Sequence, residues 1–161
     1  MANRTELDAV DRKILRQLAT DGRASYQAIA DEVRLSRPAV MERVKRLEES
    51  GYITGYGARI DRVKAGYPVT AFVAVRYANS EYVGDEPRMR EMEKHPGVLE
   101  CHHVAGEDCY ILKVAVPDLE HLQGILRDLR GPSSRTQMNT RTTIALGTVF
   151  EKPGFVPTEL D

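Results

Sequence analysis

The apolar residues of two successive segments near the start of the chain repeat at helical spacing. They are Ile29, Val33 and Leu35, followed by Val40, Val44 and Leu47. Spacings of three and four residues put apolar side chains on one face of a helix. Because only residues 34–36 separate the segments, we expect a tight turn and two steeply crossing helices, which is a helix-turn-helix.

The starts of both predicted helices carry capping residues. Ser25 and Ser36 stand where a hydroxyl oxygen accepts from the free N–H groups of the first turn, and Pro38 lies in the first turn of the second helix. An earlier helix, opened by Asp8 or Asp11 and closed by Asp21-Gly22, completes a three-helix unit. Its apolar stripe consists of Val10, Ile14, Leu15 and Leu18.

After the second helix of the pair, Gly51 is a suitable helix end. Residues 52–57 combine β-forming residues with glycines, which predicts a short strand or wing leaving this unit.

From Thr70 onward the pattern is that of a mixed sheet. Strands are predicted at residues 70–78, 98–105, 109–116 and 136–150. A short charged helix is predicted at residues 86–94, and a second helix follows Asp118 and ends at Gly131-Pro132. The second helix carries Leu119, Leu122, Ile125 and Leu129. The resulting order, β-α-β-β-α-β, predicts an α+β chain whose second domain is ferredoxin-like.

Charge is distributed unevenly over the 161 residues, although the formal net charge is only −1. Residues 1–60 carry a net charge of +2 and residues 61–161 a net charge of −3. The two cysteines, the absence of a leader and of any long apolar run favour a reduced, cytoplasmic protein that does not enter a membrane. We expect a helix-turn-helix domain at 1–60, a linker at 61–69, a ferredoxin-like domain at 70–150 and a tail at 151–161.

The outward face of the second helix is basic. Residues 34–46 contain five Lys and Arg against one acid, Glu42, which suits a surface laid against phosphates. In a helix-turn-helix the second helix enters the major groove and the start of the first lies near a phosphate. The candidate DNA-binding residues are Ser25, Tyr26, Gln27, Ser36, Arg37, Pro38, Ala39, Glu42, Lys45 and Arg46.

Two alternatives remain open for this face. A helix pair with a cationic surface is often only a solvated face without a ligand. Arg43 lies nearer the buried edge, where an ion pair with Glu48 or Glu49 competes with a phosphate contact.

Three stretches resemble the Lrp/AsnC family, the feast/famine regulators of bacteria and archaea. They are LDAVDRKILRQLATDGRAS, which resembles the family's opening helix, ERVKRLEESGYITGY, which resembles its recognition helix and exit strand, and HHVAGEDCYILKV, which resembles a loop of its amino-acid-sensing domain. The resemblance covers residues 7–151, and the three stretches occur in the family order.

The resemblance implies a transcriptional regulator that binds double-stranded DNA and a small effector, needs no cofactor, forms dimers and often builds octamers. Two positions depart from the family pattern. Arg34 replaces a glycine of the turn, which costs about 1 kcal/mol if φ is positive. Cys109 replaces the second acid of the effector loop.

The connection at Gly106 is the candidate effector site. Backbone N–H groups of a glycine-containing hairpin hold a carboxylate, and Glu107 or Asp108 offers charge to an ammonium, which together describes an α-amino acid. The alternative is a simple turn at the sheet edge. The candidate effector-binding residues are Val104, Gly106, Glu107, Asp108, Tyr110, Thr142 and Thr143.

The other candidate chemistry involves cysteine and histidine. His102 and His103 are successive residues of a predicted strand, so they point to opposite faces, and we expect no metal site. Cys101 and Cys109 are out of register for a disulfide.

Two alternative functions remain. Some proteins resembling this family are haem-pathway decarboxylases with histidines near the sensing domain, and His102, His103 and His121 keep that enzyme hypothesis open. The other alternative is an amino-acid-binding module without DNA binding. The basic second helix argues against both, so we expect a regulator that is not an enzyme. We also expect the sheet face without helices to form a homodimer.

Overall fold

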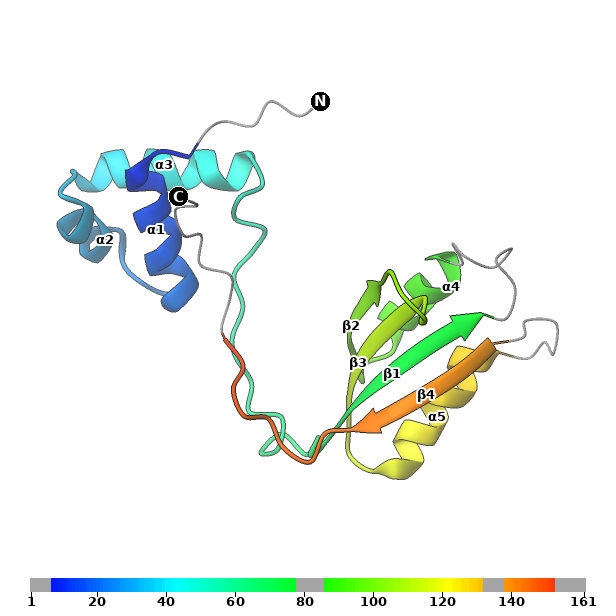
Figure 1. Ribbon diagram of the computed structural model, residues 1–161. Coiled ribbons are helices and arrows are strands. Elements are labelled where there is room, and N and C mark those ends of the chain that lie inside the picture. Colours follow the sequence, from blue (N-terminus) through cyan, green and yellow to red (C-terminus); the bar gives the residue numbers. More distant parts are fainter. Residues whose placement is uncertain (1–6, 78–85, 132–137, 153–161) are drawn as a thin grey trace. The chain divides into compact units, whose positions relative to one another are not determined.

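The computed structural model describes residues 7–77, 86–131 and 138–152, which form two compact units (Figure 1). The helical unit contains the described residues up to Arg59 and those from Phe150. The sheet unit contains the described residues of Ile60–Val149. No helix in these ranges is long and apolar enough to cross a membrane.

The helical unit consists of three helices around one apolar core, as predicted. They are α1 (Ala9–Thr20), α2 (Tyr26–Val33) and α3 (Arg37–Glu49). Asp8 caps α1, and the hydroxyl groups of Ser25 and Ser36 accept from Ala28 N–H and Ala39 N–H. The buried apolar residues are Ile14, Leu15, Ile29, Ala30, Val33, Val40, Val44 and Leu47.

The turn between α2 and α3 contains a left-handed arginine. Arg34 has φ 57° and ψ 45°, the conformation that glycine adopts most easily. Arg34 therefore meets the condition under which replacing the family's glycine costs strain, which is about 1 kcal/mol.

Residues 52–57, predicted as a short strand or wing, do not form a strand. No ladder includes this segment in the part of the chain that the structure describes. Instead, the Ile53 N–H donates to the Leu47 carbonyl at 3.1 Å, and the Tyr56 hydroxyl donates to Glu48 at 2.8 Å. The segment thus folds back on the end of α3, where no neighbouring strand offers it hydrogen bonds.

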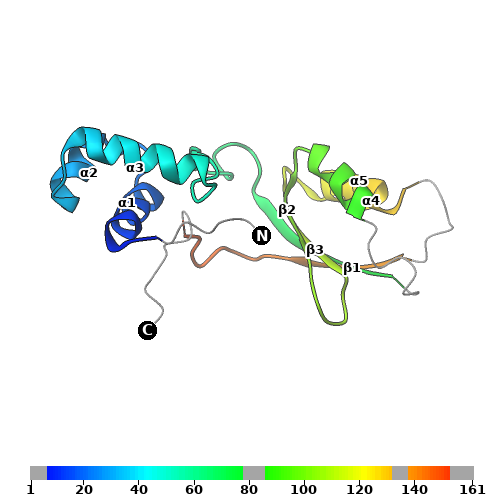
Figure 2. The ribbon, with the colours of Figure 1, turned by 90° about the horizontal axis from the view of Figure 1, so that it is seen from above.

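The sheet unit has the predicted β-α-β-β-α-β order. Its elements are β1 (Val69–Tyr77), α4 (Glu86–Glu91), the 3₁₀ helix η2 (Met92–Lys94), β2 (Val98–His103), β3 (Tyr110–Val116), α5 (Leu119–Arg130) and β4 (Met138–Ile144). The strands are antiparallel in the order β2-β3-β1-β4. Both α4 and α5 cover the same face of the sheet (Figure 2), so its other face is left without helices.

Strand alternation decides which side chains enter the core. Ala71, Val73, Val75 and Tyr77 of β1 are buried under the helices, together with Leu122, Ile125 and Leu129 of α5. Leu119, predicted to belong to the same stripe, is 54 % exposed. Phe72, Ala74 and Arg76 point to the opposite face, which we call the open face of the sheet.

The last strand is shorter than predicted. The prediction was residues 136–150, of which 136 and 137 lie outside the described residues, and β4 ends at Ile144. Ala145 N–H still donates to the Thr70 carbonyl at 2.9 Å, but β1 begins at Val69 and Pro68 has no N–H to continue the ladder. Leu146, Val149 and Phe150 are consequently exposed.

Candidate DNA interface and effector site

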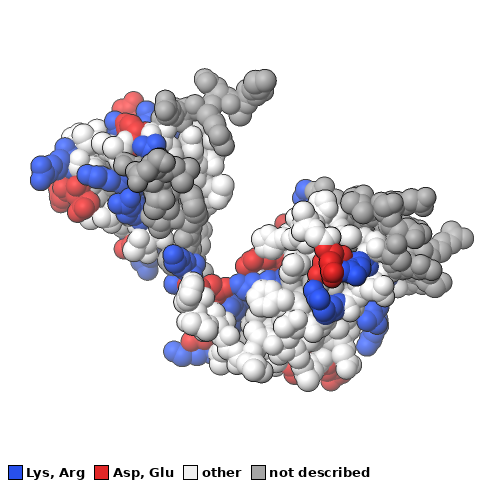
Figure 3. All heavy atoms as spheres, viewed as in Figure 1, with Lys and Arg blue, Asp and Glu red and all other residues white. Residues whose placement is uncertain are grey.

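The outer face of α3 presents a narrower basic surface than the sequence predicts. Arg37, Pro38, Glu42 and Lys45 are exposed, whereas Ala39 is half-buried. Figure 3 shows basic side chains on the helical unit near the end where α2 meets α3.

Three cations on this surface are available to a ligand. Arg34 and Arg37 are exposed, and the described residues give neither of them an ion-pair partner. Lys45 has only a long contact of 3.6 Å with Glu49, and both side chains are mostly exposed. An exposed pair of this kind is worth little, so Lys45 can exchange it for a phosphate.

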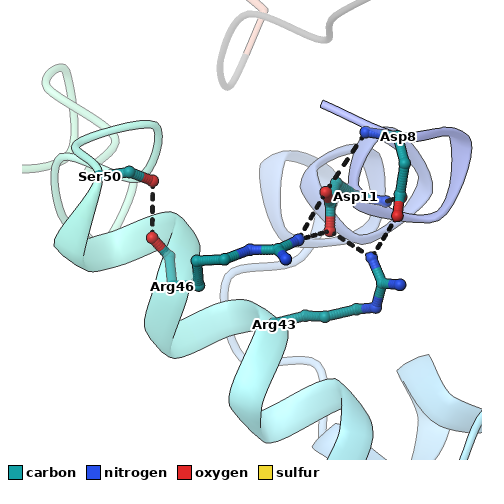
Figure 4. A network of polar contacts seen from close by, with 5 residues as sticks. All are labelled: Asp8, Asp11, Arg43, Arg46 and Ser50. Atoms are coloured by element: carbon teal, nitrogen blue, oxygen red, sulfur yellow. Dashed lines mark hydrogen bonds and ion pairs between the residues drawn. The ribbon is translucent and has the colours of Figure 1, made fainter. Parts of the chain in front are cut away.

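Arg43 and Arg46 extend to the other side, toward the start of α1 (Figure 4). Arg46 donates to both carboxylate oxygens of Asp11, at 2.9 and 2.8 Å. Arg43 donates to Asp8 at 2.6 Å and to Asp11 at 2.8 Å. Of the two alternatives for Arg43, the pairing with Glu48 or Glu49 is wrong, because its partners are Asp11 of α1 and the cap residue Asp8.

These four residues, Asp8, Asp11, Arg43 and Arg46, are the α1–α3 charge cluster. The pKa of the Asp8 carboxyl lies below its usual 3.8, chiefly because it accepts from Asp11 N–H and also because Arg43 binds it. The same carboxylates raise the pKa of the Arg43 guanidinium. Both shifts favour the ionised forms of Asp8 and Arg43, and the head groups of Arg43 and Arg46 are directed toward α1.

The start of α2 is exposed, as a backbone contact to DNA requires. Tyr26 is 36 % exposed, and Ser25 already caps the helix. The Gln27 amide donates to Asp31 on the same helix at 2.8 Å. Contact of Ser25, Tyr26 and Gln27 with DNA remains a prediction.

The sheet unit has a shallow hollow of about 210 Å³ on its open face. Its lining residues are Ala74, Arg76, Glu107, Asp108, Asn139, Thr140 and Arg141. In Figure 3 acidic and basic side chains lie side by side on the face of this unit turned toward the viewer.

Two arginines and two acids make up the charged part of the hollow. Arg76 donates to the Glu107 carbonyl at 2.6 Å and to the Glu107 carboxylate at 2.7 Å. Arg141 donates to Asp108 at 2.8 Å, and Arg76 also lies 3.9 Å from Asp108. We call Arg76, Glu107, Asp108 and Arg141 the hollow charge cluster. It offers two cations and two anions on one small surface.

Only part of the predicted effector set lies at this hollow. Glu107 and Asp108 line it, but Val104 is half-buried and Tyr110 is a core residue against Tyr77. Gly106 has φ 144°, which favours glycine, with open space around the position of a Cβ.

Thr142 and Thr143 also cannot act together, because their side chains point to opposite faces. Thr142 pairs with Val73 on the helix-covered face, whereas Thr143 pairs with Phe72 on the open face.

The histidines and cysteines are dispersed, as their positions predict. His102 pairs with Ile111 on the open face, whereas His103 pairs with Tyr110 and stacks on its ring at 4.8 Å. Cys101 lies opposite Leu112, so the predicted register against a disulfide with Cys109 is confirmed. No group of three or more potential metal ligands occurs within residues 7–77, 86–131 and 138–152.

The sequences of both units match known protein families. The winged helix-turn-helix DNA-binding family matches residues 7–54, and the Lrp/AsnC ligand binding domain matches residues 70–155. The chain belongs to the Lrp/AsnC family of transcriptional regulators.

Individual members of the Lrp/AsnC family are similar over nearly the whole chain. The HTH-type transcriptional regulator LrpA of Mycobacterium tuberculosis is 37 % identical over 94 % of this chain and 97 % of its own length. A feast or famine regulatory protein of M. tuberculosis, solved in complex with L-methionine, is 36 % identical with a TM-score of 0.83, covering 94 % of this chain and all of that one.

A more distant member shows the same fold. A transcriptional regulator of Neisseria meningitidis, also solved with L-methionine, is 25 % identical with a TM-score of 0.81, over 91 % of this chain and 94 % of that one.

Sequence reasoning missed several residues. Met41, 44 % exposed, lies one turn from both Arg37 and Lys45, and helical periodicity was sufficient to find it. Arg76 follows Phe72 and Ala74 at alternate strand positions, which placed it on the open face. Asn139 and Arg141 lie next to Arg76 because of the register between β1 and β4, which cannot be predicted from the sequence.

Proposed function

We propose that this Lrp/AsnC-family regulator binds its operator through α3 and the α2–α3 turn, and that an α-amino acid held at the hollow changes its affinity for DNA. The observation that carries the proposal is the hollow charge cluster, which presents two guanidinium groups and two carboxylates on the ligand-binding domain.

The composition of the cluster matches the two charges of a free amino acid. A guanidinium binds a carboxylate through two parallel hydrogen bonds, and Glu107 or Asp108 accepts from an ammonium group. The hollow, at about 210 Å³, is smaller than sites for drug-sized ligands, which favours a small molecule. Two solved relatives contain L-methionine, which makes it the first amino acid to test.

Exposure makes the internal pairs of the hollow exchangeable. The side chains of Glu107 and Arg141 are 81 % and 71 % exposed. Exposed ion pairs contribute about 0–1 kcal/mol, so a ligand that supplies equivalent charges replaces the Arg76–Glu107 pair at small cost. Asp108 is only 16 % exposed, so a ligand that takes Arg141 from it must also offer Asp108 a donor.

In the helical unit, the exposed cations of α3 can bind both phosphates and base edges of DNA. Arg37 is at the start of α3, the end that reaches base edges in a helix-turn-helix, and Lys45 follows two turns later. Met41 between them offers an apolar contact to a thymine methyl group.

The open face also supports assembly through a second copy of the chain. Phe72 is 42 % exposed there, and Ile111 is half-buried. Two such faces meeting would cover this apolar surface in a symmetric dimer and place the hollow, which lies on the same face, at the contact between subunits. Larger even-numbered assemblies are built from such dimers. We expect light scattering at micromolar concentration to give a dimer or a larger even-numbered assembly; a monomer would contradict this.

The direct test of the effector site is calorimetry with L-methionine and L-leucine. Arg141→Met should weaken binding by about 10-fold or more, since a hydrogen bond to a charged group contributes about 1.5–3 kcal/mol. Arg127→Met, at an exposed arginine of α5, is the matched control and should bind as the wild type does. Equal affinities in all three proteins would place the amino acid elsewhere.

We further propose that the protein acts by binding and not by catalysis. His102 and His103 occupy opposite faces of the sheet, and His121 lies in the first turn of α5 against Asp118 at 2.8 Å. The three histidines therefore do not form the cluster that the decarboxylase hypothesis requires.

A further inference from the structure

Asp11 is the buried charged residue of the described chain, with 2 % of its surface exposed. Its carboxylate accepts from Asp8 N–H at 3.3 Å, from Arg43 at 2.8 Å and from Arg46 through both oxygens (Figure 4). The same residue therefore completes the first turn of α1 and holds two side chains of the DNA-reading helix.

We propose that Asp11 is a positioning residue for DNA recognition, which fixes α3 against α1 and keeps Arg43 and Arg46 out of DNA contact. Arg34, Arg37 and Lys45 then remain to bind phosphates and bases. This inference rests on the proposed function, because it assigns roles among the cations of the same surface.

Arg43 and Arg46 remain bound to Asp11 because its carboxylate is buried. A carboxylate removed from water must keep its hydrogen-bond donors, and losing one leaves an uncompensated buried charge. Arg46 reaching for a phosphate would give up both of its bonds to Asp11. Lys45, one residue earlier on α3, has no comparable partner to lose, because its Glu49 contact is long and exposed.

The geometry also couples the orientation of α3 to the start of α1. Arg43 bridges Asp8 and Asp11, which are the cap and the third residue of α1 and bond each other's backbone N–H groups. Arg46 binds Asp11 one turn further along α3. Two anchor points one turn apart oppose both rotation and sliding of α3.

Salt dependence distinguishes cations that touch phosphates from those that do not. Each phosphate contact contributes about 0.9 to the slope of log K against log salt, because it releases condensed counterions. Arg46 bound to Asp11 contributes nothing to that slope, whereas Arg37 and Lys45 do.

The experiment measures binding by fluorescence anisotropy over a salt series, with one duplex from the gene's upstream region and one mixed-sequence duplex. Arg37→Gln and Lys45→Gln should each lower the slope by about 1 and leave the Tm unchanged. Arg46→Gln should leave the slope unchanged and lower the Tm by about 5 °C or more. Arg46→Lys should restore part of the Tm, because a single nitrogen of Arg46, Nη2, makes both bonds to Asp11 and a lysine ammonium also donates to two oxygens.

Asp11→Asn, if it folds, should raise the slope that Arg37→Gln and Lys45→Gln lower. The reason is that it releases Arg43 and Arg46 for contact with phosphates. It should bind the mixed-sequence duplex more tightly, with a slope steeper by about 1, so that discrimination between the two duplexes falls. A merely structural role would weaken binding to both duplexes equally.

Two results would overturn two different proposals, the DNA contacts of α3 and the role of Asp11. Wild-type binding that is absent or independent of salt overturns the proposed DNA contacts themselves. Salt-dependent wild-type binding, with an Arg46→Gln variant whose slope falls by about 1 at unchanged Tm, overturns only the role assigned to Asp11.

Discussion

The two charge clusters of this protein have nearly the same composition and opposite surroundings. Each contains two acids and two arginines joined at 2.6–2.8 Å in their shortest contacts. In the α1–α3 charge cluster the central acid, Asp11, is 2 % exposed. In the hollow charge cluster the Asp108 side chain is 16 % exposed and that of Glu107 is 81 % exposed.

Burial, rather than distance, separates their roles. A short ion pair that is exposed to water is easily exchanged. The same ion pair is retained around a buried carboxylate, because breaking it leaves a buried charge without a partner. We therefore propose that the first cluster fixes one helix against another and that the second exchanges its partners for a ligand.

The largest effect is expected from removing the buried acid. Asp11→Ala should destabilise the helical unit by about 3 kcal/mol, because it removes the shared acceptor of Arg43 and Arg46. Urea unfolding followed by circular dichroism measures this. Glu32→Ala, at an exposed acid of α2, is the control and should change stability by less than about 0.5 kcal/mol.

Asp108→Ala tests the other half of the comparison. If Asp108 belongs to an exchangeable cluster, its loss should cost about 1 kcal/mol or less. A loss as large as that of Asp11→Ala would show that the hollow is also a structural cluster.

An intermediate effect is expected at Gly106, beside the hollow. Its φ of 144° strains any other residue, although no neighbour lies within 4 Å of an added Cβ. Gly106→Val should therefore destabilise the sheet unit by about 1–2 kcal/mol and abolish the amino-acid response. Gly147→Val, also in open space and without a positive φ, is the control. A full response in Gly106→Val would separate this loop from the ligand.

The smallest effect is the acid sensitivity of the α1–α3 charge cluster. The pKa of Asp8 is lowered on folding, so its stabilisation is present above its usual 3.8 and is lost as the pH falls through the folded value. Thermal unfolding at about pH 5 and about pH 3 should show a smaller drop in Tm for Asp8→Asn than for the wild type. An equal drop in both proteins would remove Asp8 as the cause.

Most of the fold was predictable because local patterns carry it. Helical spacing placed the core residues of α2 and α3, serines marked their starts, and alternation separated Phe72 from Val73. Residues 52–57 and the end of the last strand failed because β propensity does not reveal whether a neighbouring strand is present.

The two charge clusters were less predictable, because each joins residues far apart in the chain. Helical periodicity gave Arg46 an outward position, and its side chain is indeed 47 % exposed, yet its head group reaches Asp11 on another helix. Arg141 meets Asp108 only because β4 pairs with β1 in one register. Such contacts depend on tertiary packing and on long side chains, neither of which follows from spacing.

The most direct test of the central claim is DNA binding by the wild type and by Arg141→Met, each measured with and without L-methionine and L-leucine. Without amino acid, both proteins should bind DNA with equal affinity. One of the two ligands should change the wild-type affinity by about 5-fold or more, with no change in the variant. An identical response in the two proteins, or no response in the wild type, would contradict the claim that an amino acid at the hollow controls DNA binding.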